Sequence, residues 1–325
     1  MHCELVVPGL FAVSGGTRFA ALELLLARGR GRSAPALALE GWLQEAFHLG
    51  EAPFAAGALT LLGRGTDPGD AVWARADPVH LRLMRDHLTM VPSDAFDLSR
   101  EEAEALCVAL NSHFSSMNFT ACEPRRWCAR LAEEIPLDAQ PPLEVSGRDV
   151  SLGGATRWHA LLNEAQMVLH EHPVNQAREA RGEPAVNSIW LWGAGRVPRE
   201  AQCLWQSVAA DDPAPLGAAR LAGARQRALP RSAQDWLERL PEDGRHLAVL
   251  DALRAPLALE KESLQAEIEA LERNWFAPLL AALRSGRTGM VTVHVPDGAE
   301  GFSSETIRGD LRRFWRLAKS IEHYA

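Results

Sequence analysis

The chain has 325 residues, 47% of them apolar, which is enough for roughly two domains with a buried core. Its net charge of -8 argues against a broad nucleic-acid-binding face, which would need clustered basic residues. The apolar run Leu22–Ala27 is too short to span a bilayer, and the first thirteen residues lack a basic signal-peptide region. We therefore expect a cytoplasmic protein that binds neither nucleic acid nor membrane.

The five cysteines are odd in number, irregularly spaced and include no Cys-x-x-Cys pair. This pattern is not typical of a disulfide framework, and it disfavours a structural zinc site. We expect small buried thiols.

The first third of the chain alternates short apolar runs with turn residues. Glu4–Val7 is predicted to be a buried strand because Pro8-Gly9 stops it. The elements predicted after it are a helix over Thr17–Arg28 capped by Thr17 or Ser14, a loop over Arg28–Ser33 and a helix over Leu39–His48.

The middle third carries clear helix signals. Ser99 with Glu102 three residues later forms a capping box, which opens a helix that runs to about Phe114. The other elements predicted here are a turn at Pro68–Asp70, a strand over Asp70–Arg75, a helix over Arg125–Glu134, loops at Gln140–Pro142 and Ser146–Gly147, a helix over Trp158–Glu171 ended by Pro173, and a strand over Ser188–Trp192 closed by Gly193–Gly195.

The last third begins with an Ala-, Pro- and Gly-rich stretch over Asp211–Pro230. A charged helix is predicted over Leu259–Leu283, a β-branched strand over Met290–Val295 and an amphipathic helix over Thr306–His323. Strands that alternate with helices indicate an α/β fold with a largely parallel sheet.

Polar residues are densest between His170 and Arg196. Ligands of open α/β sheets bind beyond the carboxyl ends of strands, where glycine backbone N–H groups approach an anion and arginines contact it bidentately. The residues expected to bind an anionic ligand are His172, Asn175, Arg178, Asn187, Gly193, Gly195 and Arg196. The alternative is a structural turn in which Asn175 and Asn187 bond the backbone. The spacing of Gly193 and Gly195 lacks the third glycine of a dinucleotide fingerprint.

These residues carry a family resemblance. They look like the central block of the archaeal-type, cofactor-independent phosphoglycerate mutases, and flanking matches follow in the right order. The matching positions are His172–Asn175, Arg178, Gly182, Pro184, Asn187, Ile189–Gly193 and Gly195, with Pro53-Phe54, Gly57, Pro68–Asp70, Ser99, Glu101–Ala103, Leu110-Asn111, Pro141-Pro142 and Gly147 on the amino-terminal side.

The resemblance implies an alkaline-phosphatase-like fold, in which a doubly wound, largely parallel sheet carries an inserted smaller α/β domain. We expect residues 1–75 and 185–325 to form the phosphatase-like domain, and residues 76–184 to form an insert that helps clamp the substrate. Members of the family hold two divalent metals, Mn or Mg, and a Ser or Thr nucleophile carries the phosphoryl group. Two cations stabilise the attacking and leaving oxygens of such a displacement.

The two ends of the chain depart from the family pattern. Pro8 stands where the first metal-binding Asp is expected, and Gly301 stands where a His is expected. Asp297 is the only remnant of the metal ligands, and Ser33 is a weakly matched candidate nucleophile. A two-metal site needs about six Asp and His ligands. We therefore expect no bound metal or other cofactor and lean towards a protein that is not an enzyme.

Three hypotheses follow. The first is a non-catalytic or regulatory homologue that binds a small phosphorylated or carboxylated metabolite. The second is a divergent, active Mn- or Mg-dependent mutase or phosphatase. Its metal ligands would come from Asp67, Asp70, Asp297, Asp310, His294 and His48. The third is a structural protein that binds a protein partner, for which the charged helix Leu259–Leu283 offers a surface.

Overall fold

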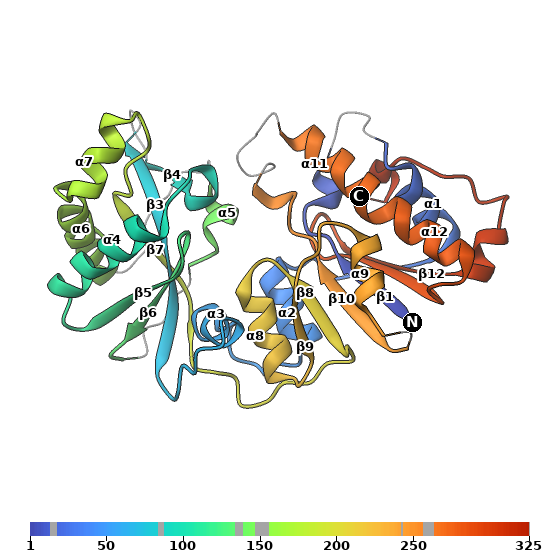
Figure 1. Cartoon of the computed structure of the whole chain (residues 1–325), viewed down its shortest axis with the longest axis horizontal. Helices are drawn as coiled ribbons and strands as arrows, with labels where there is room; N and C mark the ends of the chain where they lie inside the picture. Colours follow the sequence, from blue (N-terminus) through green and yellow to red (C-terminus); the bar gives the residue numbers. More distant parts are fainter. Residues whose placement is uncertain are drawn as a thin grey trace. The chain divides into compact units, whose positions relative to one another are not determined.

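The computed structural model describes residues 1–13, 18–83, 88–133, 139–146, 156–241, 243–255 and 263–324. The chain forms two compact units (Figure 1). Unit 1 combines residues 1–50 with 200–325, and unit 2 spans residues 51–199. The boundaries predicted after residues 75 and 184 therefore differ from those observed after Gly50 and Arg199. The first boundary shifts because helix α3 (Ala56–Gly63) packs on strands of unit 2, and the second shifts because residues 188–195 pair with a strand of that unit.

Unit 1 is built on a sheet of seven strands in the order β2-β12-β11-β1-β10-β8-β9. The neighbouring strands from β11 to β9 are all parallel to one another. Strand β12 pairs antiparallel with β11 on one side and with β2 on the other. The strands are β1 (His2–Val6), β2 (Arg30–Ala34), β8 (Ser207–Ala210), β9 (Arg225–Ala228), β10 (Arg245–Val249), β11 (Met290–Val295) and β12 (Gly301–Ile307). The helices are α1 (Ala20–Arg28), α2 (Leu39–Ala46), α8 (Pro213–Leu221), α9 (Ala233–Arg239), α11 (Leu264–Leu271) and α12 (Ala277–Ser285), with a π-helical turn at Glu272–Phe276.

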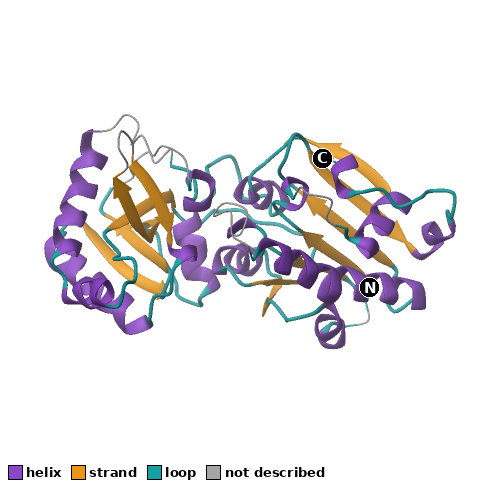
Figure 2. Cartoon of the chain, turned by 90° about the horizontal axis from the view of Figure 1, so that it is seen from above, coloured by secondary structure: helices purple, strands orange, loops and turns teal. Residues whose placement is uncertain are grey.

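Helices cover both faces of this sheet (Figure 2). Alternate residues of β11, such as Val293, pack with α1, α9, α11 and α12 in one apolar core that includes Trp236 and Phe276. His294 points to the opposite face, where its ring lies 5.2 Å from that of Trp42 on α2. Successive strand residues face opposite sides, so each strand serves both layers. The predicted α/β, doubly wound and largely parallel fold is confirmed.

Unit 2 contains a smaller sheet in which every pairing is antiparallel, with the order β4-β3-β6-β5 and β7 beside β3. Its strands are β3 (Val72–Leu83), β4 (Leu88–Pro92), β5 (Met117–Glu123), β6 (Arg126–Leu131) and β7 (Ser188–Gly195). Its helices, besides α3, are α4 (Arg100–His113), α5 (Pro142–Val145), α6 (Thr156–His170) and α7 (Pro173–Ala180). Helices α4 and α6 pack on this sheet through an apolar core that includes Leu106 and Ala165.

Several predicted elements are confirmed. The capping box of Ser99 and Glu102 opens α4, since each side chain bonds the other residue's backbone N–H. The strand at residues 290–295 appears with the predicted bounds, and the strands at residues 4–7 and 188–192 and the helices at residues 39–48 and 158–171 appear with shifted ends. The predicted caps Thr17 and Ser14 lie outside the described residues, as do residues 259–262 of the predicted charged helix.

Three predicted elements are wrong. Residues 30–34 form the edge strand β2 rather than a loop, and residues 126–131 form β6 rather than a helix. The helix predicted over Thr306–His323 is also wrong, because its first two residues end the strand β12 (Gly301–Ile307). Strand β6 lies between β3 and β5, and β12 lies between β11 and β2. Pairing partners distant in sequence therefore decide these segments, and local spacing does not reveal them. Between Arg308 and Tyr324 the described chain forms short 3-10 turns at Arg308–Arg312 and Ile321–His323.

A buried carboxylate lies on the α2 face of the large sheet. Glu4 is 1% exposed, and it accepts a hydrogen bond from Arg245 Nε at 2.7 Å while His294 Nε2 lies 3.2 Å from its other oxygen. Burial alone would raise the pKa of Glu4, but the hydrogen bonds from His294 and Arg245 and the nearby His2 outweigh burial and lower the pKa to about 2. The folded chain therefore stabilises the charged form of Glu4 more than the unfolded chain does.

We expect Glu4→Gln to reduce the free energy of unfolding at neutral pH by about 2 kcal/mol, because it removes this charge. A depressed folded pKa stabilises the fold fully above the unfolded value near 4.5, and the stabilisation is lost as the pH falls towards about 2. Urea denaturation at pH 7 and at pH 3 measures both values. The difference in the free energy of unfolding between wild type and variant should be smaller at pH 3 than at pH 7. An equal difference at both pH values would contradict this account.

Candidate functional site

The carboxyl edge of the large sheet is where ligands of this fold class bind. Strand β1 ends at Val6, and β11 ends at Val295. Gly9 follows with a φ of 81°, a conformation that glycine adopts without strain. Its backbone N–H lies 2.9 and 2.7 Å from the two carboxylate oxygens of Asp297 and donates to them. The single expected remnant of a metal centre is therefore bonded to the turn after β1.

Other acidic residues follow the neighbouring strands at this edge. Asp212 follows β8 and caps α8, since its carboxylate accepts from Ala214 N–H at 2.9 Å. Glu40 forms an ion pair with Arg254 in which nitrogen and oxygen are 3.1 Å apart. Within the described ranges, no three His, Cys, Asp or Glu side chains come together as a group able to hold a metal ion. This donor set does not fit a pair of divalent cations.

The alternative metal ligands predicted from the sequence have local contacts of their own. Asp67 accepts from Gly69 N–H within its own turn, and Asp310 pairs with Arg313 at 2.8 Å. His294 contacts Glu4. Asp67 and Asp70 belong to unit 2, whereas His48, His294, Asp297 and Asp310 belong to unit 1. Each contact given for these side chains is explained by a local structural role.

The block between His172 and Gly195 belongs entirely to unit 2. His172 is the N-cap of α7, where its Nδ1 accepts from Val174 N–H at 3.2 Å. Burial lowers the pKa of His172, so its ring is neutral and able to accept at neutral pH. Asn175 is 1% exposed, and its amide bonds the backbone of Leu169 and Val186. These two residues fix the start of α7 and its join to β7.

Arg178 is the central connection of this block. Its guanidinium is 1% exposed and donates to Pro184 O, to the Glu102 carboxylate and to Asp97 O, at 2.9, 2.9 and 2.8 Å. Arg178 thus ties α7 to the capping box of α4. Every one of its nitrogens is used inside the unit, which is the usual condition for a buried guanidinium.

The rest of the block also makes internal contacts. The Asn187 side chain bonds the N–H and C=O of Leu81, at 2.7 and 2.9 Å, as a paired strand would. A Cβ at Gly193 would lie 2.5 Å from the Cβ of Ala56, so the glycine permits close packing of α3. Arg196 is exposed and donates to Asp70 O. These contacts favour the structural alternative, and the ligand-binding role of the block stays a prediction.

Sequence reasoning missed a buried ion pair in the same unit. Arg75 NH2 lies 2.7 Å from Asp77 Oδ1, and both residues are buried. Trp192 Nε1 donates to the other Asp77 oxygen at 2.8 Å. Burial raises the pKa of Asp77, and the nearby Arg75 opposes that rise. The ion pair lies within β3, and the hydrogen bond from Trp192 to Asp77 joins the tryptophan-rich strand β7 to it.

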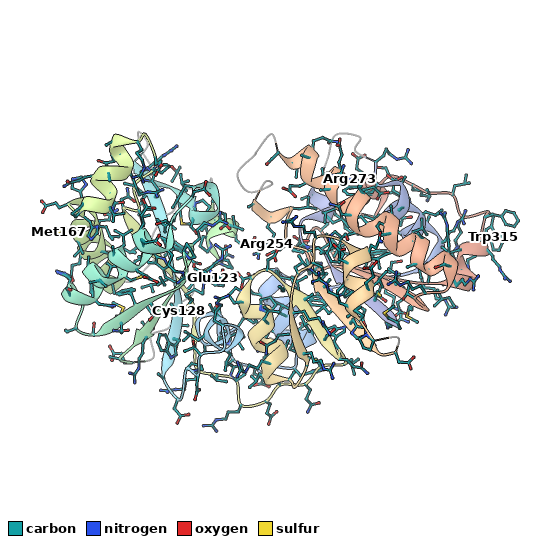
Figure 3. The ribbon with its side chains drawn as sticks, in the orientation of Figure 1. Glu123, Cys128, Met167, Arg254, Arg273 and Trp315 are labelled. Atoms are coloured by element: carbon teal, nitrogen blue, oxygen red, sulfur yellow. The ribbon has the colours of Figure 1, made fainter. Side chains whose placement is uncertain are left out.

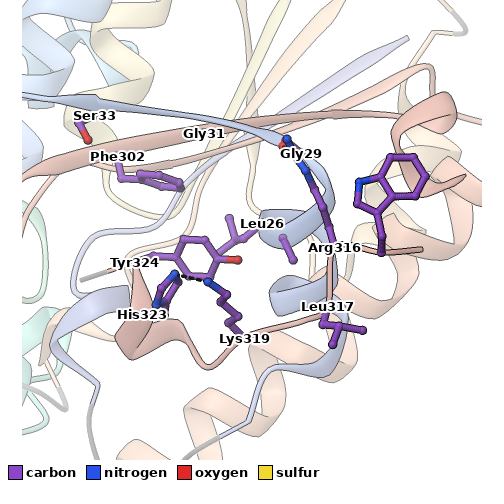
Figure 4. A pocket seen from close by; sticks show the side chains of 12 residues that line it. Leu26, Gly29, Gly31, Ser33, Phe302, Arg316, Leu317, Lys319, His323 and Tyr324 are labelled. Atoms are coloured by element: carbon purple, nitrogen blue, oxygen red, sulfur yellow. Dashed lines mark hydrogen bonds between the residues drawn. The ribbon is translucent and has the colours of Figure 1, made fainter. Parts of the chain in front are cut away.

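A cavity of about 570 Å³ in unit 1 is the second feature that the sequence did not predict (Figure 4). It lies beside Ser33, the candidate nucleophile, on the edge strand β2. Three residues of the last segment, Arg316, Lys319 and His323, line it together with Tyr324 and Phe302. Lys319 Nζ lies 2.7 Å from His323 Nε2, and Arg316 donates to Gly29 O at 2.8 Å. The segment predicted as a helix thus forms a basic wall.

We expect Arg178→Met to lower the free energy of unfolding by about 3 kcal/mol, because Glu102 and two carbonyls would lose a buried partner. Arg181→Met is the matched control: Arg181 also bonds Glu102 but is half exposed, so its loss should lower the free energy of unfolding much less. Urea denaturation measures both. If Arg178→Met were as stable as the wild type but no longer bound a phosphorylated ligand, the result would instead favour the ligand-binding role.

The fold defines an α/β protein built on a seven-stranded, largely parallel sheet. Across 94% of this chain and 87% of the other, the structure resembles that of the PH0037 protein from Pyrococcus horikoshii, with a TM-score of 0.57 and 13% identity. That likeness concerns the fold alone. Among the described residues, no helix has the length and apolar character needed to cross a membrane.

The sequence comparison gives a more specific result, although no protein family model matches the chain. A probable 2,3-bisphosphoglycerate-independent phosphoglycerate mutase of Geobacter sulfurreducens is 29% identical over 174 residues, which are 51% of this chain and 42% of that protein. The corresponding mutase of Methanosarcina mazei is 24% identical over 207 residues, or 56% and 49% of the two chains. The chain is a distant homologue of these archaeal-type mutases, and it aligns with less than half of their length.

Proposed function

We propose that the protein is a non-catalytic homologue of the 2,3-bisphosphoglycerate-independent phosphoglycerate mutases that binds a small anionic metabolite. The observation that carries the proposal is the bonding of both Asp297 oxygens to the backbone of Gly9. Pro8 precedes this glycine and has no side-chain donor. The carboxylate serves the turn at the position where family resemblance led us to expect metal.

Electrostatics supports the same proposal. Phosphoryl transfer by this superfamily relies on cations that stabilise the attacking and leaving oxygens. Each 1.36 kcal/mol of lost stabilisation slows a reaction about tenfold. A lone carboxylate already engaged by an N–H group is a poor ligand for two dications, whose charges need several anionic donors. Binding of a metabolite places no such demand on the chain.

The cavity beside Ser33 is the binding place that we propose. Its basic side chains, Arg316 and Lys319, suit a phosphate or carboxylate, since a guanidinium binds such groups bidentately and an ammonium acts as a point charge. The Lys319 ammonium donates to His323 Nε2 and keeps two further hydrogens for a ligand. A volume of about 570 Å³ is within the range of sites for small metabolites.

We expect 3-phosphoglycerate to bind the wild-type chain, and we expect the double variant Arg316→Gln/Lys319→Gln to bind it about tenfold or more weakly. Arg312→Gln is the control, because Arg312 lies on the same segment, is exposed and does not line the cavity. Isothermal titration calorimetry measures the affinities. Undetectable binding by folded wild-type protein, or equal weakening by Arg312→Gln, would contradict this binding place.

The absence of catalysis has its own test. We expect protein purified with Mn²⁺ present to carry substoichiometric metal and to show no conversion of 3-phosphoglycerate to 2-phosphoglycerate. Elemental analysis and a coupled assay measure the two quantities. Mutase activity that is lost on chelation and restored by Mn²⁺ would establish the alternative of a divergent metal-dependent enzyme.

A partner-binding role is the second candidate, and one observation favours it. Phe314, Trp315 and Leu317 are large apolar side chains that are 75, 67 and 75% exposed. Trp315 projects from the ribbon in Figure 3. Neighbouring exposed apolar side chains of this size mark interaction sites more often than isolated ones do. Stoichiometric capture of one protein by the wild type, lost in Trp315→Ser, would support this role.

A further inference from the structure

A second polar cavity lies at the amino edge of the large sheet, away from the edge where this fold class binds ligands. Its volume is about 440 Å³, and its lining includes Ser207, Arg225, Arg227 and His246. The strand register explains how they meet: His246 on β10 pairs with Ser207 on β8, and Ser207 pairs with Arg225 on β9. Residues paired in a parallel sheet share a face, so the sheet itself aligns these side chains in one row.

The serine and the histidine form a defined hydrogen-bonded pair. Ser207 Oγ lies 2.8 Å from His246 Nδ1, and His246 Nε2 lies 3.3 Å from Asp243 O. A carbonyl oxygen accepts and does not donate, so Nε2 carries the hydrogen and Nδ1 accepts from the serine. Ser207 and His246 are 2 and 0% exposed. Burial lowers the pKa of His246, which agrees with a neutral ring.

The two arginines supply positive charge without a counterion. In the part of the chain that the structure describes, neither Arg225 nor Arg227 has an ion-pair partner. The Nε of Arg227 is buried and makes no hydrogen bond with any described residue. An unsatisfied buried N–H of a charged group is costly, so the position of Arg227 calls for a compensating interaction. Arg225 is exposed, so its guanidinium is accessible to an anion.

We propose that this cavity binds the phosphate group of a small metabolite. The guanidinium groups of Arg225 and Arg227 donate to the phosphate oxygens, and the Ser207–His246 pair forms the polar wall of the cavity. Arginine suits this role because its fixed donors match the oxygens of a phosphate. The volume exceeds that of a free phosphate ion, so the ligand is a phosphomonoester with a short polar remainder rather than the free ion.

The test uses inorganic phosphate and glycerol 3-phosphate with the full chain. Two-bond ¹H–¹⁵N correlation spectra report the His246 ring, and calorimetry reports affinity. We expect both probes to shift the His246 resonances, and glycerol 3-phosphate to bind more tightly. Arg227→Gln should weaken both affinities about tenfold. Arg231→Gln is the matched control, since Arg231 is exposed and nearby in sequence but does not line the cavity.

Several outcomes would overturn the inference. They are the lack of any His246 shift in folded wild-type protein, equal weakening by Arg231→Gln, and tighter binding of free phosphate than of the monoester, which marks the ion itself as the ligand. The Arg316→Gln/Lys319→Gln variant separates this site from the cavity beside Ser33. The His246 response should persist in it, and a response lost only in that variant would assign the phosphate to the other cavity.

Discussion

The position of β1 at the centre of the large sheet is the constraint on which the rest of the structure depends. Five residues at the start of the chain pair with β10 on one side and β11 on the other, both from the last third of the sequence. Unit 1 is therefore discontinuous in sequence, and residues 51–199 form an inserted second unit. The same pairing brings the turn after β1 beside the end of β11, which is why Gly9 meets Asp297.

The central strand also explains how the chain accommodates charge within a sheet. Leu5 and Cys3 face the apolar core, while Glu4 between them faces the α2 side. A buried carboxylate is tolerated only when donors offset its desolvation, and Arg245 and His294 on the two neighbouring strands provide them. In unit 2, Arg75 pairs with the Asp77 carboxylate and Arg178 pairs with the Glu102 carboxylate in the same way. Arginine is therefore used inside this protein as a structural connector, and its abundance does not by itself indicate anion binding.

The sequence predicted the fold class and the local signals well, because capping boxes, apolar runs and glycine turns act over a few residues. Ser99 with Glu102 and the strand at residues 290–295 are examples. It failed at β2, β6 and β12, whose strand character comes from neighbours distant in the chain. The contacts of the candidate site were predicted less completely for the same reason. Ser33 and Asp297 were singled out, but the bonds of Asp297 to Gly9 and the basic wall beside Ser33 depend on long-range contacts.

The family resemblance is strongest where side chains hold the fold together. Asn175, Arg178, Asn187 and the glycines of β7 all make internal contacts in unit 2. Such positions are constrained by packing whether or not a reaction takes place, because a buried guanidinium or a close helix–strand contact admits few substitutes. The expected metal-binding positions are also in structural use, since Asp297 bonds the Gly9 N–H and a Cβ at Gly301 would lie 2.6 Å from Pro35 O. Matches at packing positions therefore indicate a shared fold rather than a shared reaction, and the proposal of a non-catalytic homologue depends on the contacts of Asp297.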